Sequence, residues 1–276
     1  MIPFTKSHGL GNDYLVLVEH DLPWPLTVPR IQRLCHRTMG VGSDGILLLT
    51  APRDGAAVGL RIFNPDGSEA EKSGNGLRIF AKFVLETRVL SRPTFRVWTA
   101  GGIVECTCHT HGGRVRSVAV EMGGVSFDAV DLPLLVGDRA LRVTTLSIGN
   151  PHCVVFADEI SAADTQALGA TLERHPIFPQ RTNVQFAHVT GRDRVAIEIW
   201  ERGAGYTLAS GSSSCAAAAA AVRTGRCDPG RITVTMPGGT LLVDVRPDWS
   251  IRLDGPVEEI CRGTLSDDLL ATLQAL

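Results

Sequence analysis

Several stretches of the chain are short and rich in β-branched residues. The clearest are VAIEIW at 195–200 and ITVTM at 232–236. β-Branched side chains fit the pleated surface of a sheet, so both stretches are predicted to be strands. GGIVECTC at 101–108 alternates in polarity and predicts a further strand, with HTHGG as the turn that follows it.

Two stretches instead predict helices, and each begins at a Ser-Gly pair. After Ser73 the apolar residues have the i, i+3, i+4, i+7, i+8 spacing of an amphipathic helix. These residues are Leu77, Phe80, Ala81, Val84 and Leu85. After Ser210 the run 215–222 is apolar on every side, which is typical of a helix buried all round. Gly225 is the predicted C-cap of this second helix.

The chain repeats itself once, with an offset of 137 or 138 residues. The matched landmarks are Gly11-Asn12 with Gly149-Asn150, Ile62 with Ile199, Ser73-Gly74 with Ser210-Gly211, and Thr99 with Met236. A constant offset of half the chain length indicates two copies of one unit. The boundary is expected between Val130 and Ser147, which gives lobes at 1–135 and 136–276. The last strands or helix are free to cross between the lobes.

This pattern predicts an α+β fold of two pseudo-symmetric lobes. Each lobe is expected to be a mostly antiparallel, barrel-like sheet wrapped around one central helix. A pseudo-two-fold axis would make the two helix N-termini face each other across a cleft.

Composition and charge exclude several classes of protein. The chain has 276 residues, 44% of them hydrophobic and 20% charged, with a net charge of −2. It carries no basic block, so we expect neither nucleic acid nor an anionic membrane as a partner. An N-terminus without an apolar signal core, and no run of membrane-spanning length, predict a cytoplasmic protein.

Seven scattered cysteines, an odd number, indicate reduced thiols rather than a disulfide framework. CTCHTH at 106–111 has the residue types of a metal site, but no CxxC partner exists elsewhere. The end of a hairpin is the favoured interpretation, and no metal is expected.

The two Ser-Gly helix starts suggest a site for an anion. A helix N-terminus offers free backbone N–H groups and partial positive charge, so it binds a carboxylate without a basic side chain. Either serine alone is best interpreted as an ordinary N-cap. Two of them on symmetry-related helices favour a shared site, where one group acts as base and the other as acid on opposite faces of a carbon. A cysteine would be the usual residue at such a tip, because the helix N-terminus lowers its pKa.

The ordered motifs of this chain resemble the diaminopimelate epimerase family, the amino-acid racemases and epimerases that use no pyridoxal phosphate. They are FTKSHGLGNDYLVL (4–17), VGSDGILLL (41–49), FNPDGSEAEKSGNGLR (63–78), SIGNPHCVVF (147–156), RTNVQFA (181–187), ERGAGYTLASGSSSCAA (201–217) and MPGG (236–239). The resemblance covers nearly the whole chain. It implies the two-lobed fold, a homodimer, no cofactor, and a role in lysine and cell-wall precursor synthesis.

The resemblance also implies the residues of the site. Two family cysteines, base and acid at the substrate α-carbon, match Ser73 and Ser210. The residues that match those holding diaminopimelate are Asn12, Asn64, Asn150, Asn183, Glu201 and Arg202. The backbone at Gly74-Asn75 and Gly211-Ser212 would take the reacting carboxylate. Two of these residues have structural alternatives: Asn64 begins a good turn, and Arg202 has Glu201 as a surface partner.

The chain departs from the family at both cysteines and at Tyr206, where a glutamate is usual. A serine hydroxyl forms little anion at neutral pH and needs an activating base. Cys215 lies five residues after Ser210, about 140° around the helix, so it points away from the tip. Three explanations stay open: an engineered substrate-trapping exchange, a natural branch that works with serines, or a relative that binds without catalysis. Tyr206 and the SGSSSC run favour the natural branch.

Three classes of function follow from these observations. An amino-acid epimerase of the diaminopimelate type is the leading hypothesis. An amino-acid binding protein that uses the same cleft is the second. A serine hydrolase with His8 or His152 as base is disfavoured, because LASGS is not a G-x-S-x-G motif.

Overall fold

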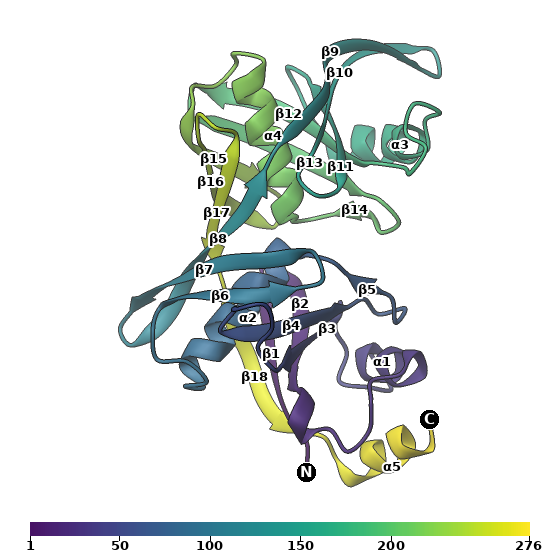
Figure 1. Cartoon of the computed structure of the whole chain (residues 1–276). Coiled ribbons are helices and arrows are strands. Elements are labelled where there is room, and N and C mark those ends of the chain that lie inside the picture. Colours follow the sequence, from purple (N-terminus) through teal and green to yellow (C-terminus); the bar gives the residue numbers. More distant parts are fainter. The chain divides into compact units, whose positions relative to one another are not determined.

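The computed structural model describes all 276 residues, which form two compact units (Figure 1). Unit 1 comprises Met1–Val120 and Gly255–Leu276, and unit 2 comprises Glu121–Asp254. The boundary expected at residue 135 falls inside strand β9 (Ser126–Val136), which lies wholly in unit 2. The chain returns to unit 1 for its last strand and helix. β8 and β17 each run through a junction between the units.

Unit 1 is one sheet with helices on its crossover connections. Its strands are β1 (Pro3–Gly9), β2 (Asn12–Val18), β3 (Ile46–Thr50), β4 (Val58–Phe63), β5 (Glu69–Ala70), β6 (Thr94–Thr99), β7 (Gly102–His111), β8 (Arg114–Gly124) and β18 (Glu258–Thr264). Its helices are η1 (Glu19–Asp21), α1 (Val28–Cys35), α2 (Gly74–Glu86) and α5 (Asp267–Ala275). The pairing order is β18-β1-β2-β3-β4-β6-β7-β8. Only β2–β3 and β4–β6 are parallel, because α1 and α2 carry the chain across between these strands.

Unit 2 repeats this order with a second set of elements. Its strands are β9, β10 (Arg139–Ser147), β11 (Pro151–Phe156), β12 (Asn183–Gly191), β13 (Arg194–Glu201), β14 (Gly205–Thr207), β15 (Gly230–Met236), β16 (Gly239–Val245) and β17 (Ser250–Pro256). The pairing order is β9-β10-β11-β12-β13-β15-β16-β17, parallel only at β11–β12 and β13–β15. Helices α3 (Ala162–Glu173) and α4 (Gly211–Arg223) make the two crossovers. The repeat predicted from the sequence is therefore a repeat of topology.

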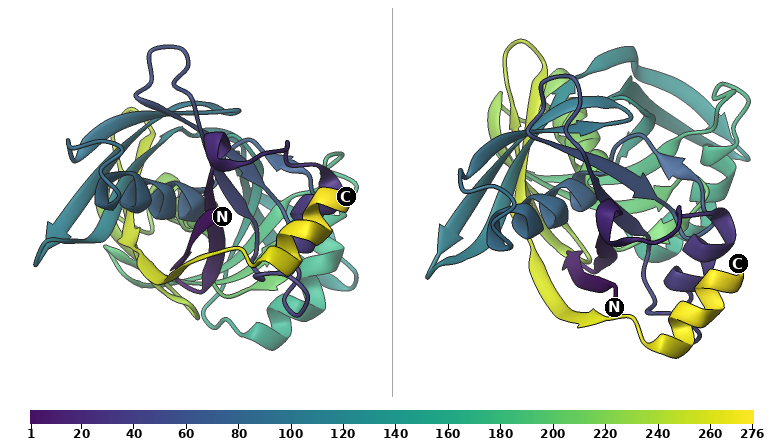
Figure 2. Two further views of the ribbon diagram at one scale, coloured as in Figure 1. Left: turned by 90° about the horizontal axis from the view of Figure 1, so that it is seen from below. Right: turned by 60° about the horizontal axis from the view of Figure 1, so that its bottom comes forward.

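One central helix lies against the sheet of each unit. α2 contacts β1, β2 and β7, and Figure 2 shows it lying among the strands of its own unit. α4 contacts β10 to β13, β15 and β16. Both helices have 13 residues, and they begin 137 positions apart in the sequence. This arrangement confirms the expected α+β class, with a mostly antiparallel sheet around a helix in each unit.

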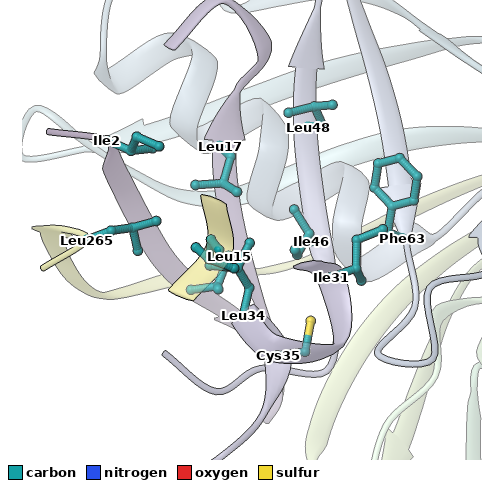
Figure 3. Packing of buried hydrophobic residues seen from close by; sticks show 11 residues of the cluster. Ile2, Leu15, Leu17, Ile31, Leu34, Cys35, Ile46, Leu48, Phe63 and Leu265 are labelled. Atoms are coloured by element: carbon teal, nitrogen blue, oxygen red, sulfur yellow. The ribbon is translucent and has the colours of Figure 1, made fainter. Parts of the chain in front are cut away.

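In the core of unit 1, β2 and β3 are continuous runs of mostly apolar residues that are buried on both faces. Leu15 and Leu17 of β2 pack with Ile46 and Leu48 of β3 in one buried cluster (Figure 3). Residues of α1 and Leu265, which follows β18, pack against these side chains in the same cluster. Side chains alternate along a strand, so the residues between these leucines fill the opposite face of the sheet, and both faces are buried.

The structure corrects three local predictions. β7 continues to His111, so the histidines of CTCHTH are strand residues, and the turn is Gly112-Gly113, both with positive φ. α2 has no exposed polar face, because Arg78 and Lys82 are buried. Thr224 is the C-cap of α4, and Gly225 follows it with φ +70°, in the left-handed region that favours glycine. None of the helices is both long and apolar enough to cross a membrane.

Candidate active site

The tip of α2 is built on Ser73, which is the N-cap of the helix. Its backbone is extended, with φ −142° and ψ 119°, and its Oγ accepts a 3.1 Å hydrogen bond from the amide of Gly76. A Cβ on Gly76 would lie 3.0 Å from Leu47 and 3.2 Å from Ser73, so a larger residue would crowd the cap. The N-cap interpretation of Ser73 is therefore correct. It does not exclude chemistry, because the hydroxyl keeps its own proton and remains partly exposed.

Asn75 connects this tip to the β1–β2 turn. It is 5% exposed, and its Nδ2 donates to Oδ1 of Asn12 over 3.3 Å. Its Oδ1 accepts a 2.7 Å bond from the buried guanidinium of Arg78. Asn12 in turn donates to Asp44 over 3.0 Å. The structure thus brings Asn12 and Asn75 together beside Ser73, as the sequence hypothesis requires.

A charged cluster that sequence reasoning missed holds the Asn12 turn in place. Arg37 donates to both carboxylate oxygens of Asp13, at 3.0 and 2.7 Å, and to Asp44 at 2.6 Å. Lys6 pairs with the same Asp13 at 3.1 Å. Burial raises the pKa of Asp13, but Arg37 and Lys6 outweigh it and hold that pKa below its usual value. No local sequence pattern predicts this cluster, because its members come from separate segments of the chain.

Asn64 occupies a turn, as its structural alternative proposed. Its backbone amide donates to the carbonyl of Ser68 over 2.8 Å, and its side chain donates to the Ser68 hydroxyl over 2.9 Å. Asp66 stabilises the same turn by accepting from the amide and the hydroxyl of Ser68. The side chain of Asn64 is thus used inside the turn that leads from β4 toward Ser73.

The tip of α4 has the same cap with more hydroxyl groups. Ser210 Oγ accepts from the amide of Ser213 over 3.4 Å and lies 3.5 Å from Oγ of Ser212. Ser214 donates its hydroxyl back to the carbonyl of Ser210 over 2.8 Å. Ser210 is 3% exposed, whereas Ser213 and Ser214 are fully buried. Gly211 and Ser212 complete the first turn.

Two polar side chains of unit 2, Gln185 and His152, are buried. Gln185 donates to the hydroxyl of Ser213 over 3.0 Å. His152 lies 3.0 Å from Asn150 through Nε2, while its Nδ1 and the Gln185 Oε1 are buried without a hydrogen-bond partner. Burial lowers the pKa of His152 to about 4, Gln185 partly offsets this, and the charge of Arg202 lowers it further. The imidazole is therefore neutral at pH 7.

Asn183 and Arg202 form the third part of unit 2 that the sequence singled out. Asn183 donates to the carbonyl of Pro151 over 3.0 Å and accepts from the backbone amide of Arg202 over 3.0 Å. The Arg202 guanidinium is exposed and donates to the carbonyl of Gln180 over 3.0 Å. The guanidinium thus bonds a backbone carbonyl of the preceding loop. These contacts orient the turn while the guanidinium remains open to solvent.

The predicted residues thus fall into two sets, one in each unit. Unit 1 holds Asn12, Asn64, Ser73, Gly74 and Asn75. Unit 2 holds Asn150, Asn183, Glu201, Arg202, Ser210, Gly211 and Ser212. Each set has a serine-capped helix, small residues in its first turn, and side-chain amides fixed by hydrogen bonds.

Two cavities are lined by other residues of the chain. A cavity of about 540 Å³ in unit 1 has a charged lining that includes His8, Lys82, Arg116 and Glu258. A second, of about 330 Å³, lies in unit 2 against α3 and includes Phe156, Ile160 and Arg226. Neither cavity contains any of the predicted site residues.

The cysteines belong to the core. Cys106 and Cys108 are buried on one face of β7, and burial raises the pKa of both thiols, that of Cys108 to about 12. His109 is exposed, and strand alternation directs it to the other face. Cys215 is also fully buried. The chain has no group of three or more His, Cys, Asp or Glu side chains arranged to hold a metal ion.

Comparison with solved structures defines the class of fold. A hydroxyproline epimerase from Agrobacterium vitis matches with a TM-score of 0.75 and 16% identity, over 96% of this chain and 90% of that one. A probable proline racemase from Agrobacterium radiobacter matches with a TM-score of 0.74 and 16% identity, over 97% and 94%. The fold is that of the two-lobed epimerases and racemases.

Comparison of sequences then identifies the family. The pattern of the diaminopimelate epimerase family matches residues 4–127 and 144–258. Diaminopimelate epimerase 2 of Nostoc sp. is 47% identical over 97% of both chains, and the diaminopimelate epimerase of Moorella thermoacetica is 40% identical over 94% of this chain and 98% of its own. The chain belongs to the diaminopimelate epimerase family.

Proposed function

We propose that the protein is an isomerase that interconverts LL- and meso-diaminopimelate by proton transfer at the α-carbon. The observation that carries the proposal is the duplicated helix tip within a chain of this family. Ser73 and Ser210 cap equivalent helices of equal length, and an amide side chain is held at the first turn of each, Asn75 at α2 and Gln185 at α4. A base on one face of a carbon and an acid on the other are what inversion of a stereocentre requires.

In this proposal Ser73 and Ser210 are the catalytic pair. One serine, as the alkoxide left when its proton has gone to solvent, takes the α-proton from its face of the substrate and becomes a hydroxyl. The hydroxyl of the other serine gives its proton to the opposite face and becomes the alkoxide. Each helix N-terminus favours negative charge on its serine and on the substrate carboxylate. Backbone amides of Gly74, Asn75, Gly211 and Ser212 bind that carboxylate.

The remaining predicted residues bind the rest of the substrate. Arg202 presents an exposed guanidinium for the distal carboxylate, and Glu201 takes the distal ammonium. The side-chain amides are supplied by Asn12, Asn64, Asn150 and Asn183. Asn150 and Asn183 are both fixed by neighbouring groups, so they keep their orientation before the ligand arrives.

A relative that binds diaminopimelate without turning it over is the second candidate. One observation favours it: within each unit, the groups that hydrogen-bond the two serine oxygens are backbone amides and the hydroxyl of Ser212. Serine needs a base to become a nucleophile or a proton acceptor. These contacts of the serine oxygens are expected both in a natural branch that works with serines and in an engineered exchange of cysteine for serine.

Solvent deuterium exchange separates the two candidates. Purified protein is incubated with meso-diaminopimelate in deuterated buffer, and the α-proton is followed by NMR. Loss of the α-proton signal with appearance of the LL isomer supports the epimerase. Calorimetric binding without exchange supports the binder, and absence of both binding and exchange contradicts both.

The setting of the proposed activity follows from the family. We place the protein in the synthesis of lysine and cell-wall precursors, in the cytoplasm, as a homodimer. All seven cysteines are free thiols, six of them buried, which suits a reducing compartment.

A further inference from the structure

Glu173, at the end of α3, carries a buried carboxylate and is not one of the predicted site residues. Glu173 is 3% exposed and is the last residue of the helix. A buried carboxylate is costly unless hydrogen bonds and charges compensate it, so its partners indicate what it does.

The two carboxylate oxygens of Glu173 accept hydrogen bonds from two different residues, one in β13 and one in the turn that follows it. Oε2 accepts a 2.7 Å bond from the indole N–H of Trp200. Oε1 accepts a 3.2 Å bond from the backbone amide of Gly203, and Arg181 lies 3.5 Å from the same oxygen. The main-chain carbonyl of Glu173 accepts from the amide of Thr182.

These partners bracket the turn that carries Glu201 and Arg202. Trp200 immediately precedes the pair and Gly203 immediately follows it, with φ +81° at Gly203. The turn is closed by the amide of Ala204, which donates to the carbonyl of Glu201 over 3.1 Å. One side chain from α3 therefore holds the turn at both ends.

We propose that Glu173 is a positioning residue that fixes the Glu201–Arg202 turn and so sets the affinity for the distal amino-acid group of the substrate. The proposal rests on the function proposed above. Without Glu173 the indole N–H and the Gly203 amide lose their acceptor, and the turn gains alternative conformations. Binding of the distal group then requires that the turn be ordered first, which lowers affinity while the serines at the reacting end are untouched.

Three variants separate this role from general support of the fold. Glu173→Leu removes both acceptors, Glu173→Gln keeps one carbonyl oxygen, and Trp200→Phe removes the indole contact but leaves the bond to Gly203. Asp164→Asn, at the other end of α3, is the matched control. Each variant is examined for diaminopimelate binding by calorimetry, for kcat and KM, and for hydrogen exchange of the Gly203 amide by NMR.

The expected order of effects is specific. Glu173→Leu weakens binding and raises KM by about tenfold or more, because a hydrogen bond to a charged group has been lost. Its kcat at saturating substrate stays within about threefold of the native value, since the reacting end keeps its geometry. The Gly203 amide exchanges faster. Glu173→Gln and Trp200→Phe, each of which keeps part of the anchoring, are intermediate, and Asp164→Asn keeps affinity and Gly203 protection close to native.

Other outcomes overturn the proposal. Native affinity in Glu173→Leu, or native protection of Gly203, would show that Glu173 does not hold the turn. An equal loss in Asp164→Asn would show that α3 supports only the fold. If Glu173→Leu does not fold, Glu173→Gln carries the same test. Absence of diaminopimelate binding by the native protein would overturn the proposed function and this ligand together, yet protection of Gly203 would still decide whether Glu173 anchors the turn.

Discussion

The hydroxyl of Tyr206 donates a 2.6 Å hydrogen bond to the carboxylate of Glu198. The two residues lie on paired strands, β14 and β13. Burial, together with the hydrogen bond and negative charge of Glu198, raises the pKa of Tyr206 to about 12. The phenol is therefore a neutral donor at physiological pH, and Glu198 gains from tyrosine a partner that a second carboxylate would not provide.

Replacement of Tyr206 by glutamate, the residue that the family resemblance implies at this position, should destabilise this protein. Tyr206→Glu places a carboxylate near Glu198, and two like charges at this distance repel each other. Thermal unfolding should show a larger loss of Tm at pH 8 than at pH 5, because protonation of either carboxylate relieves the repulsion. Tyr206→Phe serves as the control, with a loss of about 1 kcal/mol that does not change between these pH values.

The native bond should also weaken at high pH. The folded-state pKa of Tyr206, about 12, lies above the ordinary value of 10, so the folded protein holds this proton more tightly. The stabilisation is complete below pH 10 and is lost as the pH rises from 10 toward 12. Denaturant unfolding of native protein and Tyr206→Phe over this range should show the difference between them shrinking. A constant difference would contradict the assignment.

The buried, neutral His152 should make the free energy of unfolding fall in acid. Its folded-state pKa of about 4 lies below the ordinary value of 6.5, because burial disfavours the charged imidazole. The unfolded chain therefore takes up this proton first, and stability falls as the pH drops from 6.5 toward 4, by roughly 3 kcal/mol at most.

The variant His152→Asn isolates this contribution from that of the carboxylates. Both proteins are unfolded in urea at pH 7 and at pH 4.5. The native protein should lose more stability than the variant between these two conditions. Equal losses would mean that the imidazole is not held neutral by the fold.

Gly169 of α3 is expected to be irreplaceable for a packing reason. A Cβ at this position would lie 2.5 to 2.7 Å from atoms of the Trp200 side chain. Alanine favours helix by up to about 1 kcal/mol over glycine, but overpacking costs typically 1–3 kcal/mol. Gly169→Ala should therefore lower the free energy of unfolding despite the better helix propensity. Gly124→Ala, where the added Cβ meets nothing within 4 Å, is the control and should be near neutral.

Local pattern was enough to predict the framework of this molecule. The apolar run of α4 was expected to be buried on all sides, and residues 215–221 are buried. The constant offset of the repeat located both helix tips, because equivalent helices need equivalent caps. Each apolar run and each cap is encoded in a short run of consecutive residues, and the repeat needs only a comparison of one half of the sequence with the other.

Long-range polar contacts were not predictable in the same way. Helical periodicity assigns Arg78 and Lys82 to an exposed face, yet both are buried. Lys82 donates to the carbonyl of Val115, 33 residues further on, and Arg78 to the carbonyl of Pro256, 178 residues further on. The role of Glu173 could not be predicted for the same reason. Its carboxylate oxygens accept hydrogen bonds from Trp200 and Gly203 only once α3 has packed on the turn after β13.

Removal of the Arg202 guanidinium should weaken binding of diaminopimelate. The guanidinium is exposed, and its bonded partner in unit 2 is the carbonyl of Gln180. Arg202→Ala should cost roughly 1.5–3 kcal/mol of binding free energy, the worth of a charge-assisted hydrogen bond. Calorimetry with meso-diaminopimelate measures this directly. Arg181→Ala, which removes the guanidinium that lies 3.5 Å from Glu173, should have a smaller effect, and unchanged binding in Arg202→Ala would count against this substrate.

The serines provide the most direct test of the proposed reaction. The family resemblance puts cysteines at the positions of Ser73 and Ser210, and the two residues differ little in size. Each cap geometry leaves the side-chain atom next to free helix amides, which stabilise a thiolate. The double variant Ser73→Cys, Ser210→Cys should therefore raise the rate of epimerisation steeply.

Either single exchange should help far less, because one turnover needs a base on one face and an acid on the other, and residues that act as a unit are not additive. Rates are measured by α-proton exchange and by appearance of the LL isomer, with thermal unfolding to show that each variant is folded. Suppose the double variant folds, binds diaminopimelate and is no faster than the native chain. The tips then do not act as the proposed pair, since a thiolate in the same cap is the better base, and the reaction must depend on groups that this site has acquired around serine.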